Sequence, residues 1–254
     1  MLEQKFDTAP WTIRQTFLGI LFTLVPWIVL ALGLSTINAR APRAKPLPPQ
    51  LDLSNAIIVF IFSALIEGAF LIAPFYFARR TARAAIPPES AGHALGLRKF
   101  AVWRALLWVV LLFAAVVVIN VLYQDIIVNF HLPIQTNDQL ILEQAKNEPL
   151  TVYATLLASV LVAPFCEEIF FRGFVFMGLL RGMSLVWAVI FSALIFAVAH
   201  ADPGSFLVLF CIGLVLAFLR WRTRSLWPGI MLHLLNNGIG ALYIVLAMHG
   251  IATP

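Results

Sequence analysis

A short polar run, Glu167, Glu168 and Arg172, interrupts a sequence that is apolar over long stretches. Charged side chains at membrane depth are costly and normally face the protein interior or a water-filled cavity, so this run predicts a functional site. In a helix, Glu168 and Arg172 share a face, whereas Glu167 is rotated from Glu168 by about 100°. We therefore expect Glu168 and Arg172 to form an ion pair and Glu167 to remain free for chemistry. The alternative is that both glutamates only neutralise Arg172.

Two later polar pairs, Phe196 with His200 and His233 with Asn237, lie in separate apolar runs. Each pair has a four-residue spacing, which places its members on one helix face. A lone histidine at a helix end is more often structural than catalytic, and polar side chains also hold membrane helices together. Together with Glu167, however, two imidazoles and an amide provide the groups needed to activate water and stabilise an oxyanion.

The composition predicts what kind of protein positions these groups. Of the 254 residues, 61% are hydrophobic and 11% are charged, and the mean hydropathy is +0.94. Soluble domains are about half apolar and about a quarter charged. Long runs of leucine, valine, isoleucine and phenylalanine favour helices, which satisfy their own backbone groups in lipid. We therefore expect an all-α, polytopic membrane helix bundle with about seven to eight transmembrane helices.

The apolar runs divide the chain into spans that are expected at residues 14–37, 56–77, 102–123, 150–180, 184–200, 206–219 and 227–248. The fourth would be roughly 46 Å long as one helix, which exceeds a hydrocarbon core of ~30 Å, and Pro164 and Gly173 predict a kink or a break in it. Residues 1–149 hold the first three spans and their loops, and residues 150–254 form the helical core with all three polar groups. Both regions belong to one membrane domain.

The net charge of +5 is expected to set the orientation of the protein in the membrane. With a cytoplasmic N-terminus, twelve basic residues fall on the inner side and four on the outer side. The inner residues are Lys5, Arg14, Arg79, Arg80, Arg83, Arg98, Lys99, Arg104, Arg181, Arg220, Arg222 and Arg224, and the outer residues are Arg40, Arg43, Lys45 and Lys146. We expect an integral protein of the cell membrane, the inner membrane in a bacterium, that contacts membrane lipids. No basic patch interleaved with aromatic residues predicts nucleic-acid binding.

The distances along the chain predict one conflict within the site. Glu167 lies 14 residues before Arg181 and His200 lies 16 residues after Ser184, but His233 lies only nine residues after Arg224. At 1.5 Å per residue, His233 would be about 10 Å nearer the cytoplasmic surface than the other two side chains. A tilted or broken helix, or a span that begins deeper in the membrane, would be needed to bring them together.

The three motifs EExxxR at 167–172, FxxxH at 196–200 and HxxxN at 233–237 resemble those of the CPBP family of intramembrane proteases. This family contains the type II CAAX prenyl endopeptidases and the bacteriocin-immunity (Abi) proteins. The resemblance covers roughly residues 150–240. The order of the motifs and their placement on separate apolar segments make it specific, whereas each motif alone would not be.

The resemblance implies a role for each matching residue. Glu167 would activate the hydrolytic water with the help of His200, and His233 and Asn237 would stabilise the oxyanion. The other two charged residues of the first motif would form a supporting ion pair. Glu167, His200 and His233 could also bind Zn²⁺ with an open position for water, although the chain has no HExxH motif. A zinc-dependent and a metal-free mechanism both remain open.

We expect from this resemblance an intramembrane endopeptidase that cleaves a membrane-anchored or lipidated, CAAX-like protein. The alternatives are a non-catalytic immunity or scaffold protein and, less consistent with the absence of a repeated half, a small proton-coupled transporter. Glu67 is expected to make a structural polar contact, and the role of Asn236 is open. Cys166 and Cys211 lie in apolar runs, so we expect free thiols that pack as small hydrophobic residues. The sequence predicts neither the substrate nor the oligomeric state.

Overall fold

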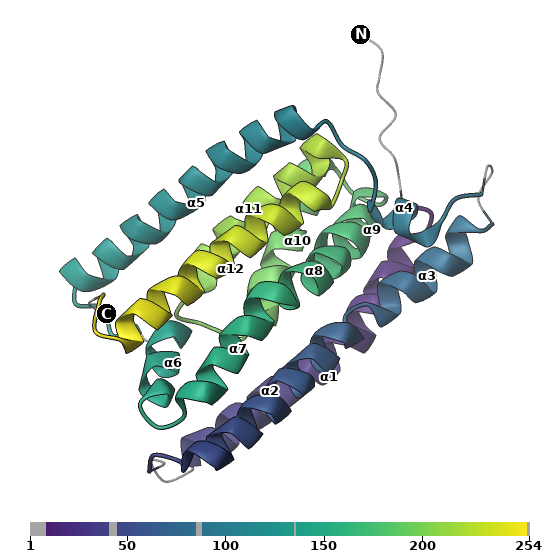
Figure 1. Ribbon diagram of the computed structural model, residues 1–254. Helices are drawn as coiled ribbons and strands as arrows, with labels where there is room; N and C mark the ends of the chain where they lie inside the picture. The colour runs from purple at the N-terminus through teal and green to yellow at the C-terminus, as the bar shows by residue number, and fades with distance from the viewer. Residues whose placement is uncertain (1–8, 41–44, 85–87, 135, 253–254) are drawn as a thin grey trace.

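All regular structure in the described part of the chain is helical (Figure 1). The computed structural model describes residues 9–40, 45–84, 88–134 and 136–252. The helices are α1 (Ile13–Arg40), α2 (Pro49–Ala69), α3 (Ile72–Ala82), α4 (Ala91–Leu95), α5 (Val102–Asn129), α6 (Asn137–Ala145), α7 (Pro149–Leu161), α8 (Ala163–Glu167), the π-helix η1 (Glu168–Val175), α9 (Phe176–Leu180), α10 (Leu185–Ala199), α11 (Phe206–Thr223) and α12 (Trp227–Met248). This confirms the predicted all-α bundle.

Six helical segments in the described chain are long and apolar enough to cross a membrane, so the protein is an integral membrane protein. They are Ile13–Gly33, Pro49–Ala82, Val102–Asn129, Pro149–Leu180, Phe206–Thr223 and Trp227–Met248. The fifth predicted span corresponds to α10, which has 15 residues. At 1.5 Å per residue α10 is about 22 Å long, shorter than a hydrocarbon core of ~30 Å. In the described residues, the seven predicted spans thus correspond to six helical segments of membrane-spanning length and one shorter apolar helix, α10.

The helices surround the segment that carries the two glutamates. Figure 1 shows α5 on one flank of the bundle and α1 with α2 and α3 on the opposite flank. The α7–α9 segment, α10, α11 and α12 lie between these flanks, and α10 packs along α11. At Gly213 in α11, an added Cβ would lie 2.8 Å from the Cα atom of Ala193 in α10. Small residues therefore allow these two helices to approach closely, as is common between membrane helices.

The long predicted span at 150–180 is broken, as Pro164 predicts. Helix α7 ends at Leu161 and α8 begins at Ala163, one residue before the proline. Proline has no backbone N–H to donate to the preceding turn, which explains why the helix is interrupted there. The chain then widens into η1, whose eight residues are all buried. Single π-helical turns in α-helices occur frequently at functional sites.

The turn after α10 lies deep in the bundle, where backbone groups need hydrogen-bond partners because lipid provides none. The indole Nε1 of Trp27 donates to the carbonyl oxygen of Ala199 at 2.7 Å. The hydroxyl of Tyr123 donates to the carbonyl oxygen of Gly204. A carboxylate oxygen of Asp202 accepts from the backbone N–H of Gly204 at 3.0 Å. Side chains from α1, α5 and the turn itself thus satisfy its backbone and hold His200 in place.

The expected depth conflict of His233 is resolved at the start of α12. The N–H of Leu226 donates to the carbonyl oxygen of Gly96 at 2.9 Å, and the hydroxyl of Ser225 donates to the carbonyl oxygen of Arg98 at 2.8 Å. Both Ser225 and Leu226 are fully buried. The chain that follows α4 therefore covers the turn between α11 and α12. Because α12 begins beneath this cover, His233 lies deeper than its distance from the arginines suggested.

The deep turn yields a first prediction. Replacing Trp27 with phenylalanine keeps most of the apolar surface but leaves the carbonyl of Ala199 without its donor, which should destabilise the protein by about 1–3 kcal/mol. Thermal unfolding in detergent, followed by circular dichroism, measures the change. Trp187→Phe is the matched control, because Trp187 is 54% exposed and should tolerate the replacement. An equal fall in melting temperature for both variants would contradict the assigned role of Trp27.

Candidate active site

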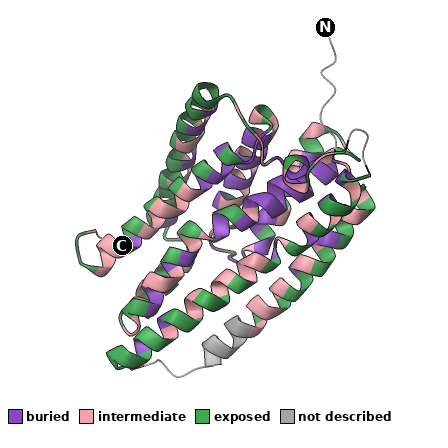
Figure 2. Ribbon diagram, turned by 45° about the vertical axis from the view of Figure 1, so that its right-hand side comes forward, coloured by how far each residue is buried: buried purple, intermediate pink, exposed green. Residues whose placement is uncertain are grey.

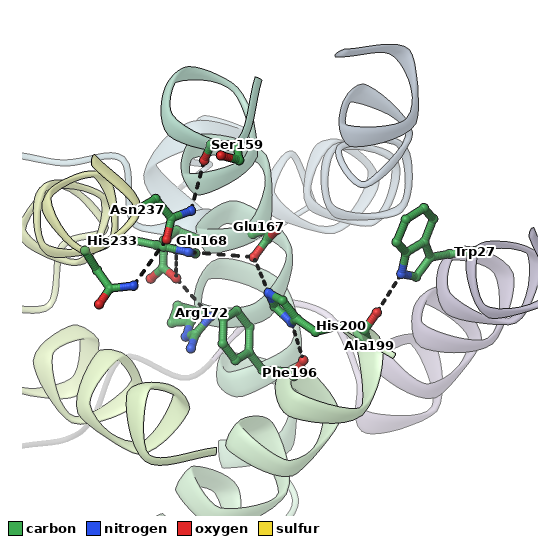
Figure 3. A network of polar contacts seen from close by, with 11 residues as sticks. Trp27, Ser159, Glu167, Glu168, Arg172, Phe196, Ala199, His200, His233 and Asn237 are labelled. Carbon is green, nitrogen blue, oxygen red and sulfur yellow. Dashed lines mark hydrogen bonds and ion pairs between the residues drawn. The ribbon is translucent and has the colours of Figure 1, made fainter. Parts of the chain in front are cut away.

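The two adjacent glutamates have different surroundings (Figure 3). Glu168 Oε1 lies 2.9 Å from Arg172 Nη1, and both side chains are fully buried. The Glu167 side chain is 12% exposed and its Oε2 faces two imidazoles. The four-residue spacing of Glu168 and Arg172 thus forms the expected ion pair. Glu167 remains outside it, with its carboxylate at the wall of a cavity.

Phe196 packs against polar side chains of all three motifs. Its ring centroid lies 4.1 Å from the guanidinium carbon of Arg172, 4.5 Å from the ring of His200 and 5.9 Å from the ring of His233. A guanidinium over an aromatic face is attracted by the ring quadrupole, most strongly where water is excluded. Phe196 therefore packs one turn before His200 and also contacts Arg172 and His233.

The structure brings the two histidines to the same carboxylate oxygen. His200 Nε2 lies 3.7 Å and His233 Nε2 lies 3.9 Å from Glu167 Oε2. The other nitrogen of His200, Nδ1, lies 2.8 Å from the carbonyl oxygen of Phe196. A carbonyl oxygen only accepts hydrogen bonds, so Nδ1 carries the proton and a neutral His200 presents the lone pair of Nε2 to the site. The Nδ1 atom of His233 lies 3.4 Å from Glu168 Oε1.

Asn237 is held at the edge of the same site. Its Nδ2 donates to the carbonyl oxygen of Ser159 at 2.9 Å, in the last turn of α7, where carbonyl groups lack helical partners. Its Oδ1 accepts from Asn236 Nδ2 at 3.3 Å. An amide nitrogen has two N–H groups, so one remains available after the bond to Ser159. Asn236, whose role the sequence left open, helps to orient this amide.

A cavity of about 340 Å³ connects these residues. Glu167, His200, His233, Asn236 and Asn237 all line it. This volume is at the lower end of the range for ligand pockets, about 300–1,000 Å³. The remaining lining residues are Trp27, Ser63, Glu67, Phe70, Thr155, Ala158, Ser159, Ala163, Phe171, Phe196, Ala199, Leu209 and Ile212. The structure therefore brings the catalytic candidates of all three motifs to one site.

Glu67 and Cys166 also lie near the cavity. Glu67 lines it from α2, and its Oε2 has no hydrogen-bond partner among the described residues. The structural polar contact expected for this oxygen is thus not seen. Cys166 is buried and does not line the cavity, and Cys211 is partly buried. Both are free thiols.

Glu167, His200 and His233 are also the candidate ligands of a zinc ion. The separations of 3.7 and 3.9 Å between Glu167 Oε2 and the two imidazole nitrogens exceed the roughly 3.3–3.4 Å between ligand atoms of a tetrahedral zinc site with bonds near 2.0–2.1 Å. In the part of the chain that the structure describes, no three His, Cys, Asp or Glu side chains are arranged to hold a metal ion. As they lie, these three side chains are spaced too widely for a zinc site.

Gly229 is a site residue that motif reasoning missed. A Cβ atom at this position in α12 would lie 2.8 Å from Glu168 Oε2. The carboxylate of the buried ion pair therefore occupies the space that a side chain would fill. The sequence held one signal, since Gly229 lies four residues before His233 and shares its helix face. The reason for a glycine there is the contact with Glu168, which the sequence does not show.

Part of the chain is similar to known proteins. Residues 149–239 match the family model described as type II CAAX prenyl endopeptidase Rce1-like. Over 101 residues the chain is 35% identical to a Bacillus subtilis (strain 168) protein named "Putative membrane peptidase YdiL". This segment is therefore similar to a membrane protease family, and the similarity does not extend over the whole chain. The matched segment spans α7 to the middle of α12 and contains all six candidate site residues.

The match has a limited extent. It covers 40% of this chain and 40% of the Bacillus subtilis relative. No solved structure matches the chain. The residues before the matched segment have no counterpart in these comparisons, although Trp27, Ser63 and Glu67 from that region line the cavity.

The fit of Glu168 against Gly229 yields a second prediction. Gly229→Ala should displace the carboxylate and destabilise the protein by about 1–3 kcal/mol, as overpacking of a core does. Gly238→Ala is the control in the same helix, because an added Cβ there has no neighbour within 4 Å. That change should leave stability equal or raise it by about 0.5–1 kcal/mol through helix propensity. Melting temperatures of the two variants in detergent test the difference, and a stable Gly229→Ala variant would contradict the close fit.

Proposed function

We propose that this protein is an intramembrane endopeptidase that hydrolyses a peptide bond of a membrane-anchored or lipidated, CAAX-like protein. The observation that carries the proposal is the approach of His200 Nε2 and His233 Nε2 to within 4.0 Å of one oxygen of Glu167, in a cavity that Asn237 also lines. The match of this segment to a membrane protease family supports it. We infer an orientation with a cytoplasmic N-terminus from the distribution of basic residues.

The nucleophile in this proposal is a water molecule between Glu167 and His200. Glu167 Oε2 and His200 Nε2 are 3.7 Å apart, too far for a direct hydrogen bond. A single water can donate one hydrogen bond to each of them, since both present lone pairs. Its own lone pair then faces the cavity and can attack a carbonyl carbon. Glu167 accepts the proton as the C–O bond forms, and that proton later passes to the leaving amine.

The oxyanion that forms on the substrate carbonyl needs hydrogen-bond donors. The second N–H of Asn237 can supply one, and His233 can supply another if its Nε2 carries a proton. Arg172 would keep the site from accumulating a second uncompensated negative charge.

The central test is the removal of the base. Glu167→Gln in purified protein should lower the rate of cleavage of a membrane-tethered peptide by about 10²–10⁴-fold, the usual contribution of a general base. Cys166→Ser is the control and should retain full activity, because this buried thiol does not line the cavity. Undiminished cleavage by the Glu167 variant would refute the mechanism. A native chain with no cleavage activity on any tethered peptide would instead favour an immunity or scaffold role.

A separate experiment addresses the metal. We expect that dialysis against a strong chelator leaves the cleavage rate of the native chain unchanged, because the three candidate ligands are too far apart to form a zinc site as they lie. Rates are compared before and after dialysis, with and without added Zn²⁺. Loss of activity on chelation together with recovery on addition of Zn²⁺ would establish the metal-dependent alternative.

A further inference from the structure

The cavity has a closed floor on the side that leads to the arginine-rich ends of the helices. Its deepest lining residues are Phe171, Phe196 and His233, and all of these are buried. Beyond Phe171 the chain from 172 to 179 contains only buried residues. Figure 2 shows this concentration of buried residues along α8, η1 and α9. A route for substrate or water from this side would have to pass through the best-packed part of the protein.

Aromatic rings fill this floor. Phe170 lies against Phe171 with ring centroids 5.0 Å apart, and Phe174 stacks on Phe77 at 5.8 Å. Trp11, which is fully buried, packs against Phe174 at 5.2 Å. The indole Nε1 of Trp11 also donates to the carbonyl oxygen of Phe174 at 3.2 Å. The segment before α1 therefore covers the side of η1 that faces the arginine-rich end of the bundle.

The segment before α1 and helix α4 also cover the arginine-rich side of η1. Arg181 Nη1 donates to the carbonyl oxygens of Ala9, Pro10 and Trp11 at 2.9–3.1 Å, which fixes the segment that carries Trp11. On another side of η1, a Cβ atom at Gly173 would lie 2.9 Å from the carbonyl oxygen of Leu95 in α4. The contact between α4 and η1 is therefore too close for a water-filled passage.

The opposite wall of the cavity is polar and rises away from this floor. Ser63 in α2, Thr155 and Ser159 in α7 and Asn236 in α12 all line it. Thr155 is only six residues after Pro149, where α7 begins. Thr155 and Ser159 lie further than Glu167 from Arg181, and Asn236 lies further than His233 from Arg224. The cavity thus extends from the catalytic candidates toward the end of the bundle where α7 begins and α12 ends.

The two ends of the bundle differ in charge. The floor end carries the basic residues Arg79, Arg80, Arg83, Arg98, Arg181, Arg220, Arg222 and Arg224 at or just beyond helix termini. The other end carries the acidic residues Asp138, Glu143 and Glu148 in and after α6. By the positive-inside rule the floor end is cytoplasmic. The wall that Thr155 and Ser159 line then lies toward the other side of the membrane.

We propose that the active-site cavity opens only toward the extracytoplasmic side, so that its substrates are peptide segments at the extracytoplasmic end of a membrane anchor. This inference rests on the proposed protease function and narrows its substrate class. A lipidated tail in the cytoplasm would have to cross the aromatic floor to reach Glu167. A segment that emerges from the membrane on the α6 side would approach Glu167 along the wall that Thr155 and Ser159 line, beside the buried cluster of Val152, Leu156 and Ile244.

Cysteine labelling tests the direction of access without requiring catalysis. The background carries Cys166→Ser and Cys211→Ser, which removes both native thiols. Ser159→Cys then places one thiol on the polar wall, Gln139→Cys reports on the α6 side, and Arg83→Cys reports on the arginine side. A membrane-impermeant maleimide is added to right-side-out and to inside-out vesicles. Thiols react only where water and reagent reach them.

We expect Ser159→Cys to be labelled in the same vesicles as Gln139→Cys, namely the right-side-out ones, and to be protected in the vesicles that label Arg83→Cys. Labelling of Ser159→Cys together with Arg83→Cys would overturn the proposal. Labelling from neither side would overturn it as well, because the cavity would then be closed to the extracytoplasmic side. The two reporter positions show in the same experiment that the background chain is inserted in one orientation.

A cleavage assay with the native chain provides a second measurement. One peptide sequence is attached to the cytoplasmic end of a membrane anchor in one substrate and to the extracytoplasmic end in another. Only the extracytoplasmic substrate should be cleaved, and Glu167→Gln should abolish that cleavage. Glu167-dependent cleavage of the cytoplasmic substrate would refute the direction of access but leave the protease function intact. Absence of cleavage on both sides, with labelling as expected, would refute the protease function alone.

Discussion

The buried ion pair of Glu168 and Arg172 is the interaction on which the rest of the site depends. Neither partner can be removed without leaving an uncompensated charge in a water-free interior, which would be strongly destabilising. The pair dictates its surroundings: the ring of Phe196 covers the guanidinium, and Gly229 leaves room for the carboxylate. Because Glu168 neutralises Arg172, Glu167 is not fixed in an ion pair of its own. The supporting pair thereby makes the adjacent carboxylate available to water and substrate.

A second constraint is the satisfaction of backbone groups at membrane depth. The breaks that shape the site, at the end of α7 and in the turn after α10, expose carbonyl groups that lipid cannot hydrogen-bond. Asn237 serves the carbonyl of Ser159, and Trp27 serves that of Ala199. These donors come from helices distant in sequence. Each bond that completes the backbone therefore also fixes the position of one wall of the cavity, which joins fold stability to site geometry.

The sequence was sufficient for the helical class and for the partition of the two glutamates, because both follow from local rules of composition and spacing. It was insufficient where long-range contacts decide. The depth of His233 depends on the chain after α4, which bonds Ser225 and Leu226, and no periodicity in α12 reveals that cover. Helix α10 was predicted to be a full membrane span because its composition is as apolar as that of a longer span. Gly229 had no motif to mark it, since its importance comes from a carboxylate about 60 residues away along the chain.

The closed floor and the ion pair have a common physical origin. The attraction within an ion pair is stronger where water is excluded, and the rings of Phe171 and Phe196 lie 5.8 and 4.1 Å from the guanidinium carbon of Arg172 and exclude water there. A hydrolytic site, in contrast, must admit water to the carboxylate one residue earlier. The change from fully buried to partly exposed occurs between Glu168 and Glu167, within a single peptide unit. Access from the far side of the cavity reconciles both requirements, because water can then reach Glu167 without crossing the charges that Glu168 and Arg172 keep dry.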